Sequence, residues 1–274
     1  ENMNTRVRGR KDLDDLSVPF IGEIPLAICG KKKVKSHEAH TIVVKEGSRD
    51  IMNEAFRVLR TNLEFMIGKD RSSNVIVITS FNPGSGKSFL TMNIAMSLAI
   101  KNKKVLVIDG DLRHASASAY IHSPEVGLSN YLGGQVDELS DIIVTDKQHP
   151  SFSFIPVGTI PPNPTELLFN DRLQDAIHTL KQQYDVVLID CPPVELVADT
   201  QIIEKWADRT VFVVRAGLLE RSMLPELENI YREKKYKNMS VILNGTEGAG
   251  GRYGYRYGYR YGYGSGSYYG SSSK

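Results

Sequence analysis

The sequence predicts an α/β fold, a doubly wound and mostly parallel sheet, followed by a disordered C-terminal tail. Short segments rich in Val, Ile and Leu alternate with helical patterns along most of the 274 residues. The apolar segments, which we predict to be buried strands, lie at 75–78, 105–108, 152–157, 184–190, 210–214 and 240–243. Helical patterns occupy 51–66, 90–98, 200–207 and 224–234. Crossover connections between parallel strands produce this alternation, so we expect a parallel sheet.

Composition limits the classes of partner. Hydrophobic residues make up 41% of the chain and the formal net charge is +2, which suits a soluble globular protein and argues against a bulk polyanion such as nucleic acid. No apolar run approaches the ~18–20 residues of a membrane span. Cys29 and Cys191 form no metal-type pair, so a reduced cytoplasmic setting is expected. The first residue is Glu and not Met, so we expect the sequence to be a piece of a longer chain.

We divide the chain into three parts: an arm at 1–50, a nucleotide-binding domain at 51–244 and a flexible tail at 245–274. The arm contains two basic clusters, at 6–11 and 31–35. They are either a solvated surface or a flank attracted to anionic lipid, at about 1 kcal/mol per basic residue. Between them, 18–25 predicts a short strand that packs on the domain.

The segment from the strand at 75–78 to the following helix has the pattern of a phosphate-binding P-loop. Loop amides and the positive end of the helix can bind an anion, Lys87 adds a charge for the outer phosphates, and the Ser88 hydroxyl can bind Mg²⁺. The predicted nucleotide-binding residues of this loop are Asn82, Pro83, Gly84, Ser85, Gly86, Lys87, Ser88 and Phe89. The pattern departs from the usual one, because Phe81 stands where the first glycine is expected and a proline lies inside the loop.

Two further predicted strands end in aspartates. Asp109 and Asp111 follow the strand at 105–108, and Asp190 closes the strand at 184–190. The carboxyl ends of parallel strands border the crevice where open α/β sheets bind ligands, so we predict that these carboxylates and Ser88 hold Mg²⁺. The alternative is that the first pair forms a surface turn.

The helix at 51–66 carries a polar ridge beside its apolar stripe. Glu54, Arg57 and Arg60 recur at three-residue intervals. They are either ion pairs within an amphipathic helix, worth tenths of a kcal/mol each, or a ridge that binds another subunit.

Later in the chain, the proline-rich 158–164 must be a rigid loop, and Thr165 is expected to cap a helix that begins at Glu166.

The tail differs sharply in composition from the rest of the chain. It contains eight of the thirteen tyrosines, interleaved with Gly and Arg: Tyr253, Tyr255, Tyr257, Tyr259, Tyr261, Tyr263, Tyr268 and Tyr269. With almost no aliphatic residues it cannot offset its ordering entropy, so we expect disorder. Its tyrosines are either phosphorylation substrates or aromatic groups that stack on single-stranded nucleic acid.

Taken in order, these motifs resemble those of the bacterial tyrosine kinases (BY-kinases) that regulate capsule and exopolysaccharide synthesis. The P-loop resembles that family's Walker A, 109–113 its Walker A′ and 187–193 its Walker B. Residues 161–168 are similar to another family block, and 54–60 match its Glu-x-x-Arg-x-x-Arg helix. The tyrosine cluster completes the resemblance, which covers nearly all of 18–269.

The resemblance implies an ATP-dependent and Mg²⁺-dependent protein-tyrosine kinase that autophosphorylates its tail tyrosines. Lys87, Asp109, Asp111 and Arg113 would be catalytic, with Asp109 as proton acceptor, and Asn244 would contact adenine. Glu54, Arg57 and Arg60 would join subunits into a ring. A membrane-spanning activator, fused or separate, and a cognate tyrosine phosphatase would be partners, at the cytoplasmic face of the inner membrane.

Two other functions remain open from the sequence. The first is an ATPase switch of the partitioning or division-site type, in which water replaces tyrosine as nucleophile. Those proteins normally carry an extra lysine early in the P-loop, which 80–83 lacks. The second is a nucleic-acid-binding module that uses the Arg/Tyr tail.

Overall fold

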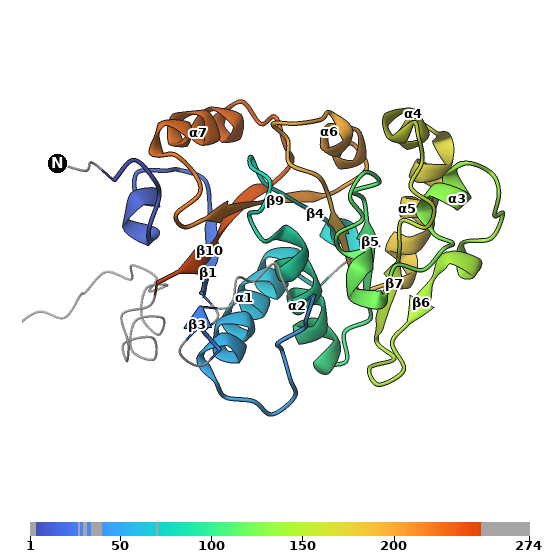
Figure 1. Ribbon diagram of the computed structural model, residues 1–274, viewed down its shortest axis with the longest axis horizontal. Coiled ribbons are helices and arrows are strands. Elements are labelled where there is room, and N and C mark those ends of the chain that lie inside the picture. The colour runs from blue at the N-terminus through green and yellow to red at the C-terminus, as the bar shows by residue number, and fades with distance from the viewer. Residues whose placement is uncertain (1–3, 27, 30–31, 34–39, 70, 248–274) are drawn as a thin grey trace, which may run out of the picture.

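The computed structural model describes residues 4–26, 28–29, 32–33, 40–69 and 71–247 (Figure 1). An eight-stranded sheet has the order β1–β10–β9–β4–β8–β5–β7–β6, parallel except that β6 is antiparallel to β7. Its strands are β1 (Phe20–Pro25), β4 (Val75–Thr79), β5 (Val105–Asp109), β6 (Val144–Thr145), β7 (Phe152–Ile155), β8 (Val186–Asp190), β9 (Arg209–Arg215) and β10 (Met239–Thr246). A separate antiparallel pair joins β2 (Ile28–Cys29) to β3 (Lys32–Lys33).

Helices cover both faces of the sheet (Figure 1). One face carries α1 (Ile51–Ile67) and α2 (Lys87–Ile100). The other carries α3 (Leu128–Leu132), α4 (Pro164–Leu168), α5 (Asp171–Gln183), α6 (Asp199–Glu204) and α7 (Leu224–Arg232). Single 3-10 turns are η1 (Arg10–Leu13), η2 (Arg71–Ser73), η3 (Ser118–Ile121), η4 (Leu139–Ile142) and η5 (Arg221–Met223).

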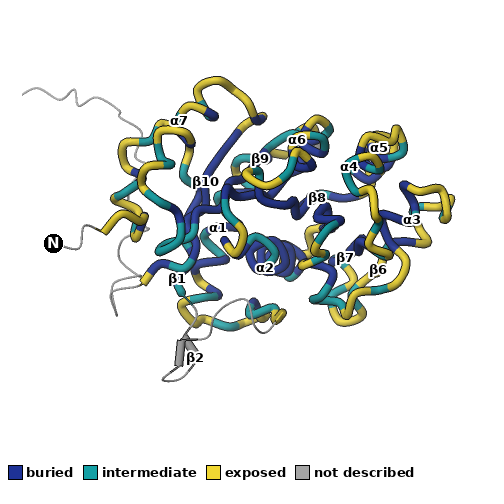
Figure 2. Tube along the Cα trace, turned by 45° about the horizontal axis from the view of Figure 1, so that its top comes forward, coloured by how far each residue is buried: buried dark blue, intermediate teal, exposed yellow. Residues whose placement is uncertain are grey.

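The strands are apolar on both faces because both faces are covered. In β4, Ile76 and Ile78 pack in the cluster beneath α1 and α2, whereas Val75 and Val77 pack in the cluster beneath α5 and α6. All five β4 residues are buried, and Figure 2 draws the sheet and most of α2 as buried, with more exposed residues on α5 and α7. Continuous apolar runs are typical of parallel strands buried on both sides, which explains why the sequence contains them.

The predicted doubly wound, mostly parallel sheet is confirmed, and each predicted strand and helix is present with ends shifted by a few residues. Three local features differ from expectation. The antiparallel pair of β2 and β3 was not predicted. The short antiparallel β6 was not predicted, since its two residues are both exposed and carry no hydrophobic pattern. The helix expected to begin at Glu166 with Thr165 as its cap begins instead at Pro164, with Asn163 at the N-cap position.

The arm at 1–50 contributes an edge strand to the sheet of the 51–244 segment. β1 pairs in parallel with β10, and Val7 and Leu13 are buried in the cluster beneath α7. The division into arm, domain and tail remains a prediction, and the eight tail tyrosines lie outside the described residues. Within the described ranges, no helix is both long enough and apolar enough to cross a membrane.

Candidate active site

The loop between β4 and α2 lies at the carboxyl edge of the sheet, near its middle (Figure 1). Its two glycines both have positive φ, +75° at Gly84 and +88° at Gly86. A Cβ at Gly86 would lie 2.2 Å from Nδ2 of Asn244. Glycine is therefore required at this position for its conformation and for space. The next residue, Lys87, is the first of α2, so the positive end of the helix adjoins the loop.

Side chains from within the loop and from two neighbouring strands fix its backbone. The hydroxyls of Ser80 and Ser85 both donate to the carbonyl of Asn82, at 2.7 and 2.8 Å. From β10, Asn244 donates to the carbonyl of Ser85 at 3.0 Å, and from β9, Arg215 donates to that of Gly84 at 3.1 Å. The described contacts of Asn244, predicted to bind adenine, thus include support of the loop.

The unusual Phe81 has a packing explanation. Its side chain is 6% exposed and belongs to the hydrophobic cluster beneath α7. Its ring centroid lies 5.4 Å from that of Phe212 in β9. The first residue of the loop therefore anchors the loop to the core, which a glycine could not do.

The cation side of the site is formed by Ser88 and Asp190. Ser88 Oγ donates to Asp190 Oδ2 at 2.5 Å. Asp190 is 1% exposed, and its Oδ1 is a buried oxygen without a hydrogen-bond partner in the described part of the chain. An unpaired buried carboxylate oxygen is costly unless a cation or a donor arrives. These two residues therefore fit a Mg²⁺ ion.

Burial also changes the ionisation of the two strand-terminal carboxyls. Asp109 and Asp190 are register partners on the adjacent strands β5 and β8. Burial, and then the neighbouring Asp190, raises the pKa of Asp109 to about 8. Burial raises the pKa of Asp190 to about 6, although Lys87 and Ser88 oppose the shift. A bound cation would stabilise the charged form of both carboxyls.

The three predicted carboxylates do not form a ready-made cation cluster. Among the described residues, no group of three or more His, Cys, Asp or Glu is arranged to hold a metal ion. Asp109 Oδ2 accepts from the amide and hydroxyl of Ser118, at 2.8 and 2.6 Å, and its Oδ1 from the amide of Asp111. Asp111 Oδ1 accepts from the amides of Arg113 and His114. Mg²⁺ usually keeps several waters and few carboxylate ligands, so indirect roles suit these two.

The Arg113 side chain is held by residues that the sequence did not connect with it. Its Nε donates to Asp199 Oδ2 at 2.9 Å and its Nη2 to Thr165 Oγ1 at 2.9 Å. Thr165 in turn donates to Asp199 Oδ1 at 2.8 Å, and Asp199 is fully buried. Thr165 thus belongs to this network and not to a helix cap. The residue type of Thr165 gave no sign of this, because its two partners, Arg113 and Asp199, come from distant segments of the chain.

The predicted ridge on α1 is only partly exposed. Glu54 and Arg57 form an ion pair with each other. Arg60 is 8% exposed and donates to the carbonyl and hydroxyl of Ser97 in α2. The ridge is thus partly engaged within the chain, and its role between subunits remains a prediction.

Comparison with known proteins places the chain in a family. A family model described as an AAA domain matches residues 73–240. The chain is 36% identical over 203 residues to the tyrosine-protein kinase CpsD of Streptococcus agalactiae, covering 86% of that protein and 73% of this chain. The chain belongs to the bacterial tyrosine-protein kinase family. This confirms the resemblance seen in its motifs.

The solved structures agree with that assignment. The kinase domain of the Escherichia coli tyrosine kinase ETK superposes with a TM-score of 0.78 at 30% identity, over 94% of this chain and all of that one. The septum site-determining protein MinD of Pyrococcus horikoshii gives a TM-score of 0.50 at 23% identity, over 62% of this chain and 68% of that one. The division-site ATPases are therefore relatives in fold alone.

Some relatives are much longer. The putative tyrosine-protein kinase AmsA of Erwinia amylovora is 32% identical over 261 residues, which are 89% of this chain but 35% of that protein. The chain thus spans about a third of that relative.

The family's fold implies nucleotide binding by the loop between β4 and α2.

Proposed function

We propose that this chain is an ATP-dependent protein-tyrosine kinase whose substrates include the tyrosines of its own tail. The observation that carries the proposal is the pairing of the glycine loop with Ser88 and the unsatisfied oxygen of Asp190. A loop for phosphates and an adjacent place for a divalent cation are the two parts that phosphoryl transfer requires. The eight tail tyrosines supply hydroxyl nucleophiles on the same chain.

Each residue of the site would bind a different part of MgATP, according to its position. Lys87, at the start of α2, and the amides of the loop would hold the phosphates of ATP. Ser88 and Asp190 would hold Mg²⁺, with Asp109 and Asp111 acting through water or orienting the others. When bound, the ion neutralises charge on the phosphates. Asn244 supports the loop and would border the adenine.

The proton acceptor is assigned to Asp109. A tyrosine hydroxyl has a pKa of about 10, so its attack near neutral pH benefits from a carboxylate that accepts the proton. Without a bound ion, burial and Asp190 raise the pKa of Asp109 to about 8, so this carboxyl is mostly protonated at neutral pH. A nearby Mg²⁺ would lower that pKa and favour the carboxylate that can accept the proton. Asp109 is also fully buried, so a tyrosine oxygen would reach it only after local rearrangement or through a water.

The relatives support a proposal about the wider role of the chain. We propose that the chain works at the cytoplasmic face of the inner membrane in capsule or exopolysaccharide synthesis. Its partners would be a membrane-spanning activator, a tyrosine phosphatase and neighbouring copies that present their tails in trans. Glu54, Arg57 and Arg60 would take part in the contact between copies.

The test is the appearance of phosphotyrosine after incubation with MgATP. Wild-type chain should become labelled, and Lys87→Met should not, because the change removes the charge that faces the phosphates. Circular dichroism should show the same fold in both. Equal labelling of a well-folded Lys87→Met chain would refute the site.

A further inference from the structure

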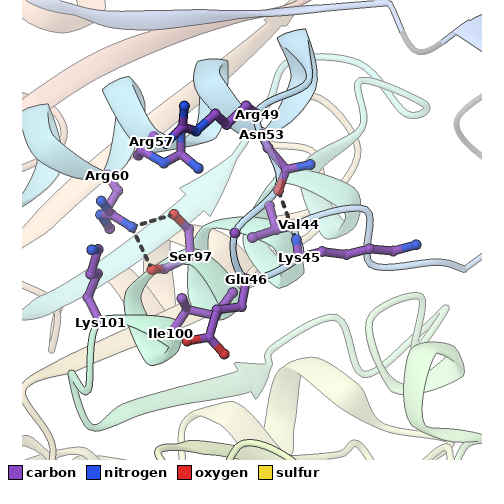
Figure 3. A pocket seen from close by; sticks show the side chains of 11 residues that line it. Val44, Lys45, Glu46, Arg49, Asn53, Arg57, Arg60, Ser97, Ile100 and Lys101 are labelled. Carbon is purple, nitrogen blue, oxygen red and sulfur yellow. Dashed lines mark hydrogen bonds between the residues drawn. The ribbon is translucent and has the colours of Figure 1, made fainter.

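A second concave site lies at the opposite end of α2 from the P-loop. It is a cavity of about 370 Å³ between the segment 44–49, helix α1 and the last turn of α2 (Figure 3). The 14 residues of α2, at 1.5 Å each, separate it from the P-loop by roughly 20 Å. It is therefore distinct from the nucleotide site.

The cavity is strongly basic. Five of its eleven lining residues are Lys or Arg, and among these described residues Glu46 is the one carboxylate. Figure 3 shows Arg57, Arg60 and Lys101 along one side, whereas Lys45 extends away. Glu54 neutralises part of this charge through its pair with Arg57, and the carbonyls at the end of α2 carry partial negative charge. Arg49, Arg60 and Lys101 still leave an excess of positive charge.

Arg60 is the central group. It is 8% exposed, and burial lowers the pKa of its guanidinium. Its Nη1 donates to the carbonyl and hydroxyl of Ser97 at 3.0 and 3.3 Å. Its Nε and Nη2 have no acceptor among the described residues. Glu64, one turn along α1, forms no ion pair with it there, although the charge of Glu64 partly offsets the fall in its pKa. A buried cation that is only partly compensated is unfavourable, so an anion in the cavity would stabilise it.

The remaining lining suits more than a bare anion. Val44 and Ile100 contribute aliphatic surface, and Arg57 Nη2, bonded to the carbonyl of Ser48 at 2.6 Å, is fixed in place. A volume of about 370 Å³ falls within the usual range for small-molecule pockets, and exceeds what a phosphate ion needs. Arginine forks beside an apolar surface are a recurrent arrangement for phosphorylated side chains.

We propose that this cavity binds an aryl phosphate, with Arg57 and Arg60 on the phosphate oxygens and Val44 and Ile100 against the ring. The natural source would be a phosphotyrosine made by the chain, and this clause alone rests on the proposed function. The cavity would then recognise the product of the P-loop site at a separate place. Because Arg57 and Arg60 are also the predicted subunit contact, a bound phosphotyrosine would compete with assembly.

The experiment uses ¹⁵N NMR titration of the full chain carrying Lys87→Met, which weakens phosphate binding at the P-loop and prevents self-phosphorylation. Phenyl phosphate is the probe, and inorganic phosphate is the comparison. The expected result is saturable shifts at Asn53, Ser97 and Lys101, with inorganic phosphate binding at least several-fold more weakly. Shifts confined to 84–88, or equal affinity for the two anions, would overturn the proposal.

Two variants locate the binding further. Arg57→Gln should weaken phenyl phosphate about 10-fold, the effect expected for loss of one charge-assisted hydrogen bond. Lys103→Ala removes an exposed lysine two residues beyond Lys101 that does not line the cavity, and should leave affinity unchanged. Unaltered binding in a folded Arg57→Gln chain would contradict the assignment. A chain that binds phenyl phosphate but makes no phosphotyrosine would refute only the kinase.

Discussion

The two ends of α2 handle charge in opposite ways. At its N-terminal end, a glycine loop, the helix dipole and Lys87 face buried carboxyls that a cation would satisfy. At its C-terminal end, Arg57, Arg60 and Lys101 line one side of a cavity with an excess of positive charge. The first arrangement suits a phosphate together with a metal ion, whereas the second suits an anion alone. Only the first end combines the two parts that phosphoryl transfer requires.

The largest effect on activity is expected at Asp190, which lies with Ser88 at the N-terminal end of α2. Asp190→Asn should lower kinase activity ~100-fold or more by removing a Mg²⁺ contact. Asp111→Asn should lower it too, by disturbing the water or the neighbouring groups through which Asp111 acts. The Asp190 change should also raise the melting temperature of the nucleotide-free chain at pH 8. The folded pKa of Asp190 is raised to about 6, so its charge costs stability increasingly as pH rises from about 4 to 6 and fully above that. The gain is at most about 3 kcal/mol.

The two readouts separate functional from structural carboxylates. Activity is measured as phosphotyrosine formed per minute at saturating ATP, and stability by calorimetry at pH 4 and pH 8. If Asp190 is a structural residue, Asp190→Asn will lower the melting temperature at both pH values and leave the rate of the folded protein unchanged.

The next effect concerns the shape of the loop. Gly86→Ala forces a side chain into φ +88° and toward Nδ2 of Asn244 at 2.2 Å. We expect ATP affinity to fall at least ~10-fold and stability by about 1–2 kcal/mol. Adding Asn244→Ala removes the clash but not the strain, so it should restore part of the stability. Full recovery in the double variant would mean that the positive φ is unimportant.

A smaller effect is expected at Arg113, which lies beside the first end. Arg113→Ala removes the hydrogen bonds from Arg113 to the buried Asp199 and leaves the one from Thr165. The free energy of unfolding should fall by about 1–2 kcal/mol, a figure kept small because solvent reaches the arginine. Asp199→Asn in the same chain should recover part of that loss. If Arg113 also binds phosphate, activity will stay low in the stabilised double variant. Recovery of activity with stability would make its role purely structural.

The smallest change in free energy is expected for Arg57 and Arg60, near the C-terminal end of α2. The double variant Arg57→Ala/Arg60→Ala should lower the mass of the assembly, measured by light scattering at high protein concentration, if the ridge joins subunits. Arg232→Ala, an exposed arginine on α7 paired with Glu228, is the matched control. An unchanged mass, from wild-type protein that does assemble, would remove the ridge from the interface.

Most of the fold could be predicted because its signals are local. Buried parallel strands require continuous apolar runs, and the glycine loop requires Gly84 and Gly86 at fixed places in the chain. β6 escaped prediction because two exposed residues leave no hydrophobic pattern. Thr165 was misplaced for a related reason: a threonine before a helix usually caps it, and only the distant Asp199 and Arg113 show otherwise.

The sequence proposed a set of candidate site residues but not their arrangement. Ser88, Asp109 and Asp190 do lie on neighbouring elements, and their role in binding stays a prediction, because burial and partners depend on tertiary contacts. Nothing in the sequence indicated that Ser118 would occupy one oxygen of Asp109, or that Asp190 would keep an oxygen unsatisfied. The same applies to Arg60, which reads as an exposed ridge residue and is largely buried.

The most direct measurement follows the fate of the γ-phosphate. The full chain is incubated with MgATP, and phosphate on tail tyrosines, mapped by mass spectrometry, is compared with phosphate released to water. The kinase account predicts that tail tyrosines, Tyr253 to Tyr269, become phosphorylated in wild-type chain and stay unmodified in Lys87→Met. Release of phosphate without any phosphotyrosine would contradict it and identify the chain as an ATPase switch.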